Sequence, residues 1–163
     1  MGSLVTVEPR LARKLLEPLA TIVQNTSAKS LQFECIHTVT LALPFTRRED
    51  GSDAKNVPAV LNLCLHHLRV LLQDDDPNLK YLGLVGLLSL LRSHPRVVLE
   101  QRGLVLLCLG EGDATIRVKA LELLVGVVTK KTLRDLVQHL LEVRSSSRQL
   151  SSLLSTRLLF PSV

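Results

Sequence analysis

Residues 76–84 read DPNLKYLGL and residues 113–121 read DATIRVKAL, so one pattern occurs twice at an offset of 37 residues. A small residue recurs in this register, because Gly83 of the first copy matches Ala120 of the second. An earlier copy fits at an offset of 48, with matching positions at Leu31, Phe33, Cys35, Ile36 and Val39. Apolar residues within each copy follow helical spacing. The sequence therefore predicts a repeated helical unit.

The length of the repeat indicates how these helices are arranged. A helix-pair period near 40 residues is the signature of HEAT and armadillo solenoids. One helix pair cannot bury its own apolar face, so neighbouring pairs stack into a continuous core. The small residues Cys35, Gly83 and Ala120 share one position, which favours close helix–helix approach. We therefore predict an all-α fold, a HEAT/armadillo-like α-solenoid of stacked antiparallel helix pairs.

Proline, glycine and short polar clusters mark where the predicted helices begin and end. A first helix opens at Glu8-Pro9, and Pro18 is expected to kink it or to split it into two. Further helices are predicted over residues 28–43, 58–73, 77–93, 114–129 and 132–143, with two short helical pieces around Gly103 between residues 95 and 109. The polar residues 46–56 are predicted to form an exposed loop.

Three polar clusters are predicted to cap the helices that follow them. Residues 25–27, Asn-Thr-Ser, precede the second helix, whereas the acidic residues 74–76 and Asp113 precede two later ones. Side chains of these types accept hydrogen bonds from the free N–H groups of a first helical turn. The Ser/Leu-rich tail, residues 144–163, carries no predicted structure.

The composition favours a scaffold over an enzyme with a deep pocket. Hydrophobic residues make up 46% of the 163-residue chain and aromatic residues only 2%, so the apolar mass is almost entirely Leu and Val. Such side chains suit closely packed helices, and few flat rings are left to stack on a ligand or a base.

The net charge of +5 arises from the second half of the chain. Residues 82–163 hold eleven Lys and Arg against six Asp and Glu, whereas residues 1–81 hold nine of each. Nucleic-acid-binding proteins gather their basic residues into a stripe or patch, and here no basic run exceeds two residues. We therefore expect no nucleic-acid partner, with a nucleic-acid-binding helical repeat as the alternative from another functional class.

Three cysteines, Cys35, Cys64 and Cys108, lie within apolar helical patterns. Their odd number and wide spacing, without a signal peptide before them, predict reduced, buried thiols in a cytosolic protein. The longest apolar run, residues 82–91, is about half as long as the roughly 20 residues of a membrane-spanning helix. No membrane span is therefore predicted.

No catalytic or metal-binding pattern stands out. His66 and His67 are adjacent, so they point to different sides of a helix, and Cys64 with His67 would supply only two ligands. Gly110-x-Gly112 lacks the preceding strand and the further Gly or Lys of a phosphate-binding loop. We expect neither an enzyme nor a cofactor.

An acid precedes a base by six residues twice in register with the repeat: Asp74 before Lys80, and Glu111 before Arg117. This arrangement resembles the Asp–Arg ladder of HEAT repeats, in which the turn acid of one repeat pairs with the base of a neighbour. These four residues are the candidate ladder residues. Ordinary helix caps and solvated bases are the alternative explanation for each residue alone.

Three stretches resemble the trunk of the large adaptins. They are residues 25–39 (NTSAKSLQFECIHTV), residues 75–84 (DDPNLKYLGL) and residues 113–131 (DATIRVKALELLVGVVTKK). With EPRLARKLLEPL at residues 8–19, the chain is most similar to the delta type of large chain in adaptor protein complex three. The resemblance covers about residues 4–143, and the tail after Arg144 departs from the family pattern.

This resemblance implies a structural subunit of a clathrin-adaptor-type vesicle coat. It implies assembly with a small, a medium and a second large chain, and a cytoplasmic protein bound peripherally to Golgi and endosomal membranes. The implied role is protein transport to the lysosome or vacuole, without enzyme activity or cofactor. The alternative is another HEAT/armadillo protein-interaction scaffold, of the nuclear-transport or phosphatase-scaffold type.

Overall fold

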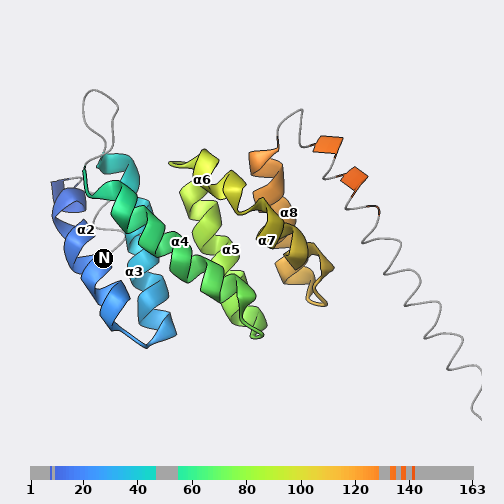
Figure 1. Cartoon of the computed structure of the whole chain (residues 1–163), viewed down its shortest axis with the longest axis horizontal. Helices are drawn as coiled ribbons and strands as arrows, with labels where there is room; N and C mark the ends of the chain where they lie inside the picture. Colours follow the sequence, from blue (N-terminus) through green and yellow to red (C-terminus); the bar gives the residue numbers. More distant parts are fainter. Residues whose placement is uncertain are drawn as a thin grey trace, which may run out of the picture.

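The computed structural model describes residues 8, 10–46, 55–128, 133, 134, 137, 138 and 141. All regular structure in these residues is helical (Figure 1). The elements are α2 (Arg10–Asn25), α3 (Lys29–Ala42), the short 3-10 helix η1 (Leu43–Phe45), α4 (Val57–Gln73), α5 (Pro77–Leu91), α6 (Pro95–Glu100), α7 (Arg102–Leu107), the 3-10 helix η2 (Cys108–Gly110) and α8 (Ala114–Val127).

The helices stack in two layers, from α2 and α3 at one end to α7 and α8 at the other (Figure 1). One layer contains α3, α5 and α8, in which α5 contacts both neighbours. The other contains α2, α4 and α7, in which α4 contacts both neighbours. Each pair also packs across the layers, α2 on α3, α4 on α5, and α7 on α8. The predicted all-α solenoid of stacked helix pairs is therefore confirmed.

Aliphatic side chains fill the space between the layers. The largest fully buried ones are Leu16, Ile36, Leu43, Leu68, Leu84, Leu87, Leu90, Ile116 and Leu123. Each buried leucine or isoleucine stabilises the fold by about 1.5–3 kcal/mol through removal of apolar surface from water. The core runs continuously from α2 to α8, so no single helix pair holds a closed core of its own.

Two glycines let α5 approach α4 closely. A Cβ atom built at Gly83 would lie 3.0 Å from Leu72 Cγ, and one built at Gly86 would overlap Leu68 Cδ2. Gly83 occupies the small-residue position of the repeat, and its counterparts Cys35 and Ala120 are also buried.

Two predicted helix breaks differ from the structure. Helix α2 continues through Pro18 as a single helix, so the predicted split is wrong, whereas the predicted kink stays a prediction. The break between α6 and α7 lies at Gln101, and Gly103 lies inside α7. Gln101 is buried and its backbone N–H binds Val98 O at 3.0 Å, which closes one helical turn before the next begins.

Of the three polar clusters predicted to cap helices, two supply a side-chain cap and one does not. Asp76 and Asp113 cap α5 and α8 as predicted, because each carboxylate accepts a hydrogen bond from the second residue after it. In contrast, the residue that caps α3 is Ala28, which offers no side-chain acceptor. Thr26 instead accepts a hydrogen bond from the Ala28 N–H at 3.3 Å.

The predicted loop and the predicted last helix are described only in part. Thr46, the first loop residue, is buried and its hydroxyl donates to Leu43 O at 2.7 Å, whereas residues 47–54 lie outside the described residues. Within residues 132–143 the five described residues are helical, and the rest lie outside the described residues, as do residues 144–163. In the part of the chain that is described, no helix combines the length and apolar character needed to cross a membrane.

Candidate functional site: the charged edge between helix pairs

The candidate ladder residues lie along one edge of the solenoid, where the α4–α5 turn and the η2–α8 turn meet the first turns of the following helices. Lys80, in the first turn of α5, forms an ion pair with Glu111, in the turn before α8. The hydrogen bond to Glu111 raises the pKa of Lys80 above its ordinary value. This pair joins one helix pair to the next.

Asp74 binds a residue that the sequence pattern did not include. Its carboxylate forms an ion pair with Lys29, at the start of α3, and accepts the Asp76 N–H at 3.1 Å. The Lys29 hydrogen bond, followed by that of Asp76, lowers the pKa of Asp74. The sequence analysis missed Lys29 because the residue equivalent to Lys80 in the first copy of the repeat is Gln32 and not Lys29.

Arg117 occupies the register position of Lys80 but acts within its own turn. Its guanidinium donates to the backbone carbonyls of Glu111 and Gly112, both at 2.7 Å. At the same position of the first copy, the Gln32 side chain donates to Val23 O at 3.0 Å. Each copy of the repeat therefore has a hydrogen-bond donor at this position, Gln32, Lys80 or Arg117, but the acceptor that it binds differs between copies.

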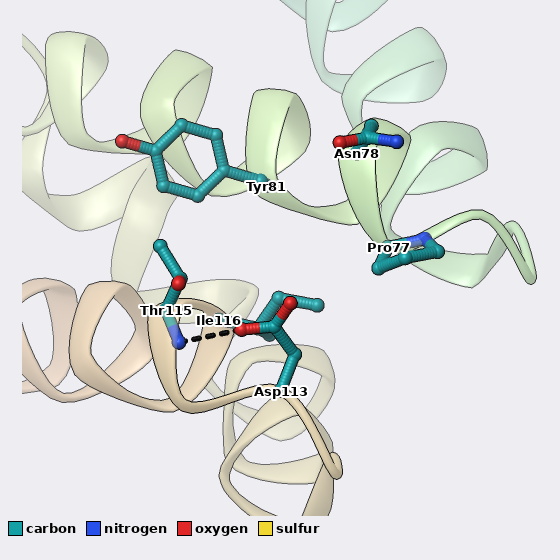
Figure 2. Close-up of a pocket in the computed structure, with 6 residues that line it drawn as sticks. All are labelled: Pro77, Asn78, Tyr81, Asp113, Thr115 and Ile116. Atoms are coloured by element: carbon teal, nitrogen blue, oxygen red, sulfur yellow. Dashed lines mark hydrogen bonds between the residues drawn. The ribbon is translucent and has the colours of Figure 1, made fainter.

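Between the N-termini of α5 and α8 lies a small open hollow of about 180 Å³ (Figure 2). It is lined by Pro77, Asn78, Tyr81, Asp113, Thr115 and Ile116. The Asp113 carboxylate is engaged, because it accepts the Thr115 N–H at 2.6 Å, and this hydrogen bond lowers the pKa of Asp113. The Thr115 side chain lowers the pKa of Asp113 further, so Asp113 and Thr115 engage each other within the hollow.

The remaining chemically reactive side chains are dispersed. Burial, with a smaller contribution from Cys35, raises the pKa of the Cys64 thiol to about 12, which keeps it protonated and unreactive. His66 and His67 lie edge to face with ring centroids 5.3 Å apart, and burial together with His66 lowers the pKa of His67. Among the described residues, no three His, Cys, Asp or Glu side chains gather where they could hold a metal ion.

The geometry is thus that of a stack of helix pairs whose turns are joined by ion pairs. The model of the family described as "Adaptin N terminal region" matches residues 1–156. The chain belongs to the adaptin N-terminal family. This match confirms the resemblance carried by the three sequence stretches.

Curated adaptin relatives extend this finding across distant organisms. The chain is 44% identical over 140 residues to the "AP-3 complex subunit delta-1" of Bos taurus, which covers 86% of this chain and 11% of the relative. It is 39% identical over 141 residues to the "AP-3 complex subunit delta" of Dictyostelium discoideum, an alignment that again covers 86% of this chain and 11% of the relative. It is 34% identical over 140 residues to the "AP-3 complex subunit delta" of Arabidopsis thaliana, which covers 86% of this chain and 15% of the relative.

This adaptin chain therefore corresponds to a small part of its relatives, between about a tenth and a sixth of their length. Proteins named as gamma-like large chains also match, but over about half of the chain: the "AP-1 complex subunit gamma-like 2" of Mus musculus is 35% identical over 78 residues. The matches to the delta-named relatives are longer, at 140 or 141 residues, and the two most identical of those quoted, at 44% and 39%, are delta-named.

Proposed function

We propose that the chain is a trunk segment of a delta-type large adaptin, a non-catalytic structural part of a vesicle coat complex of the adaptor-complex-3 type. The observation that carries this proposal is the match to the adaptin N-terminal family, together with delta-named relatives aligned over 86% of the chain. The stack of helix pairs supports a scaffold role, because a solenoid offers an extended surface to partner proteins.

The proposed mechanism is presentation of a curved helical surface whose shape is fixed at the turns. Each ion pair joins a lysine near the start of α3 or α5 to an acid in the turn after the first helix of the next pair. Lys29 pairs with Asp74, and Lys80 pairs with Glu111. These connections restrain the rotation between successive pairs, which sets the curvature of a solenoid. Of the candidate ladder residues, Asp74, Lys80 and Glu111 are proposed to have this structural role. Arg117 is proposed to hold the turn before α8, through its hydrogen bonds to the Glu111 and Gly112 carbonyls.

Within this proposal the partners are the small, medium and second large chains of the same complex. The chain would act in the cytoplasm, at Golgi or endosomal membranes, and would reach the membrane through the assembled complex. Its transport step would lead towards the lysosome or vacuole. It would require no cofactor and would not bind nucleic acid.

Co-expression with small chains tests the proposal directly. We expect the 163-residue chain to capture the small chain of adaptor complex 3 more efficiently than the small chains of the other adaptor complexes. Leu16→Asp is the matched control, since Leu16 is fully buried and its replacement should unfold the stack and abolish capture. Equal capture of all small chains would overturn the delta assignment.

If the co-expression experiment shows no capture, a second experiment distinguishes a coat subunit from another kind of helical scaffold. If a chain that circular dichroism reports as helical captures no small chain, the flanking repeats present in its longer relatives are added. Capture regained with the flanks would retain the coat function and assign the contact surface to them. No capture in either form would favour the alternative, a HEAT/armadillo interaction scaffold of another kind.

A further inference from the structure

A buried glutamine holds an exposed arginine at the break between α6 and α7. Gln101 is 3% exposed, and its side-chain oxygen accepts the Nε–H of Arg69, an exposed residue of α4, at 2.6 Å. The Gln101 amide nitrogen donates to Val97 O at 3.4 Å, so both ends of the amide are engaged. The Nη groups carry four of the five guanidinium donors, and they donate to no described residue. Arg69 is therefore held in one orientation with its Nη edge available to a ligand.

Two further arginines lie on the helices that meet at this break. Arg96 is the second residue of α6, Arg102 is the first residue of α7, and both are exposed. Neither forms an ion pair with a residue that the structure describes. A cation in the first turn of a helix meets the positive end of the helix dipole, so helix stability does not account for these two positions. We name Arg69, Arg96 and Arg102 the arginine cluster.

Little negative charge is available on the same helices to neutralise the arginine cluster. Glu100 is the only acidic residue in the sequences of α4, α5, α6 and α7. Two of the three acids in the turn after α4 are engaged elsewhere, because Asp74 pairs with Lys29 and Asp76 caps α5. The cluster therefore has an excess of positive charge.

The residues around the cluster resemble a protein interface more than a membrane-binding surface. Val70 of α4 is 46% exposed and Leu107 of α7 is 69% exposed, and these two helices are neighbours in one layer (Figure 1). Protein interfaces are enriched in arginine and depleted in lysine. Membrane-surface segments instead combine about 4–8 Lys or Arg with Trp, Phe or Leu, and α4, α6 and α7 contain no lysine and no aromatic residue except histidine.

We propose that the arginine cluster is a docking site for an acidic surface of a partner protein, in which a Glu or Asp carboxylate of the partner binds the Nη groups of Arg69. A planar guanidinium fork matches a carboxylate with two parallel hydrogen bonds. Gln101 is a positioning residue, because a side chain that is already oriented loses less freedom on binding. Arg96 and Arg102 attract the acidic partner and favour it over neutral ones. The proposal is independent of the proposed coat function.

Fluorescence anisotropy with a labelled hexaglutamate peptide tests the site in the full 163-residue chain. We expect the chain to bind this peptide at physiological salt and not to bind a hexaglutamine peptide. Arg69→Gln should weaken binding about tenfold, as the loss of a central interface arginine does. Arg10→Gln is the matched control, because it removes the same charge from an exposed arginine at the start of α2, at the other end of the stack. Its effect should be much smaller.

A second variant separates the geometry of Arg69 from its charge. Arg69→Lys keeps the charge but removes the planar fork and the bond to Gln101, so it should lose most of the affinity that Arg69→Gln loses. Circular dichroism checks that each variant keeps its helices. Arg102→Gln provides a further test if both Arg69 variants unfold, since Arg102 makes no hydrogen bond to a described residue, and it should also weaken binding more than Arg10→Gln.

Three results would overturn the proposal. The first is no binding of hexaglutamate, or equal losses in the cluster variants and in Arg10→Gln. The second is Arg69-dependent binding to vesicles of phosphatidylcholine and phosphatidylserine, which would assign the cluster to a membrane surface. The third is an Arg69-dependent dimer in sedimentation velocity, which would assign it to the acidic residues of a second copy.

Discussion

Lys80 of α5 and Glu111 of the turn before α8 form an ion pair that joins two successive helix pairs. The Lys80 side chain is only 15% exposed, so its charge is screened less than that of a surface lysine. One helix pair earlier, Lys29 and Asp74 make the same kind of connection. In both pairs the lysine lies near the start of one helix, α3 or α5, and the acid lies in the turn before the next helix of the same layer, α5 or α8.

Removal of the Lys80–Glu111 pair should loosen the stack between α5 and α8. We expect Lys80→Met and Glu111→Gln each to lower the free energy of unfolding by about 1 kcal/mol, near the upper end for partly exposed ion pairs. A double-mutant cycle in urea should give a coupling of about 0.5–1 kcal/mol. Lys119→Met is the control, because Lys119 pairs with Glu122 on the same helix, and it should have a smaller effect. A coupling near zero would show that this ion pair does not stabilise the stack.

The pH dependence of stability should have an acid limb and an alkaline limb. Hydrogen bonds lower the pKa of Asp74 and Asp113 below 3.8 in the folded chain, so their contribution is complete above about pH 4 and is lost as the pH falls further. The pKa of Lys80 is raised above 10.5, so its contribution is complete below that pH and is lost at higher pH.

Urea midpoints measured between pH 2 and pH 12 check both limbs. Asp74→Asn should flatten the acid limb and leave the alkaline limb in place, whereas Lys80→Met should do the reverse. An unchanged acid limb in Asp74→Asn would mean that the Lys29 pair contributes nothing to acid stability.

The sequence predicted the repeat well because the repeat is a property of helical spacing and turn chemistry. Asp76 and Asp113 lie where a carboxylate can reach the first free N–H groups, and both act as caps. The break at Gln101, two residues before Gly103, was not predicted, and Gln101 makes a tertiary contact that its sequence neighbours do not reveal. Its side-chain oxygen accepts the Arg69 Nε–H at 2.6 Å, and Arg69 lies 32 residues away on α4.

The ion pairs show a second limit of prediction from the sequence. The repeat register identified Lys80, Arg117 and their preceding acids, but not which donor reaches which acceptor. Arg117 donates to a backbone carbonyl of the turn that precedes its own helix. Asp74 pairs with Lys29, which lies three residues before Gln32, the residue equivalent to Lys80 in the first copy. Long flexible side chains select partners by distance in the folded chain, and that distance is not encoded in their spacing along the sequence.

We expect the close packing of α5 on α4 to require a glycine at position 86. A Cβ at Gly86 would overlap the fully buried Leu68, so we expect Gly86→Ala to destabilise the fold by about 1–3 kcal/mol despite the better helix propensity of alanine. Gly103 is the control, because a Cβ there meets nothing within 4 Å and Gly103 lies inside α7. Gly103→Ala should stabilise by about 0.5–1 kcal/mol. Opposite signs in thermal unfolding would confirm the close approach, and equal signs would contradict it.

The buried thiols give an independent measure of how tightly the stack is closed. Burial raises the pKa of Cys64 to about 12 and also raises the pKa values of Cys35 and Cys108, so few thiolates are present at pH 8. We expect a thiol-reactive disulfide reagent to label the native chain slowly and all three cysteines rapidly in guanidinium chloride. Leu107→Cys supplies a control thiol, since Leu107 is 69% exposed, and that thiol should react at once.

Labelling of Cys64 should accelerate in Gly86→Ala, and its rate should rise exponentially with the lost free energy of unfolding, because the reagent then reports how often the α4–α5 contact opens. Rapid labelling of Cys64 in the unaltered native chain would mean that the contact between these helices is open to solvent.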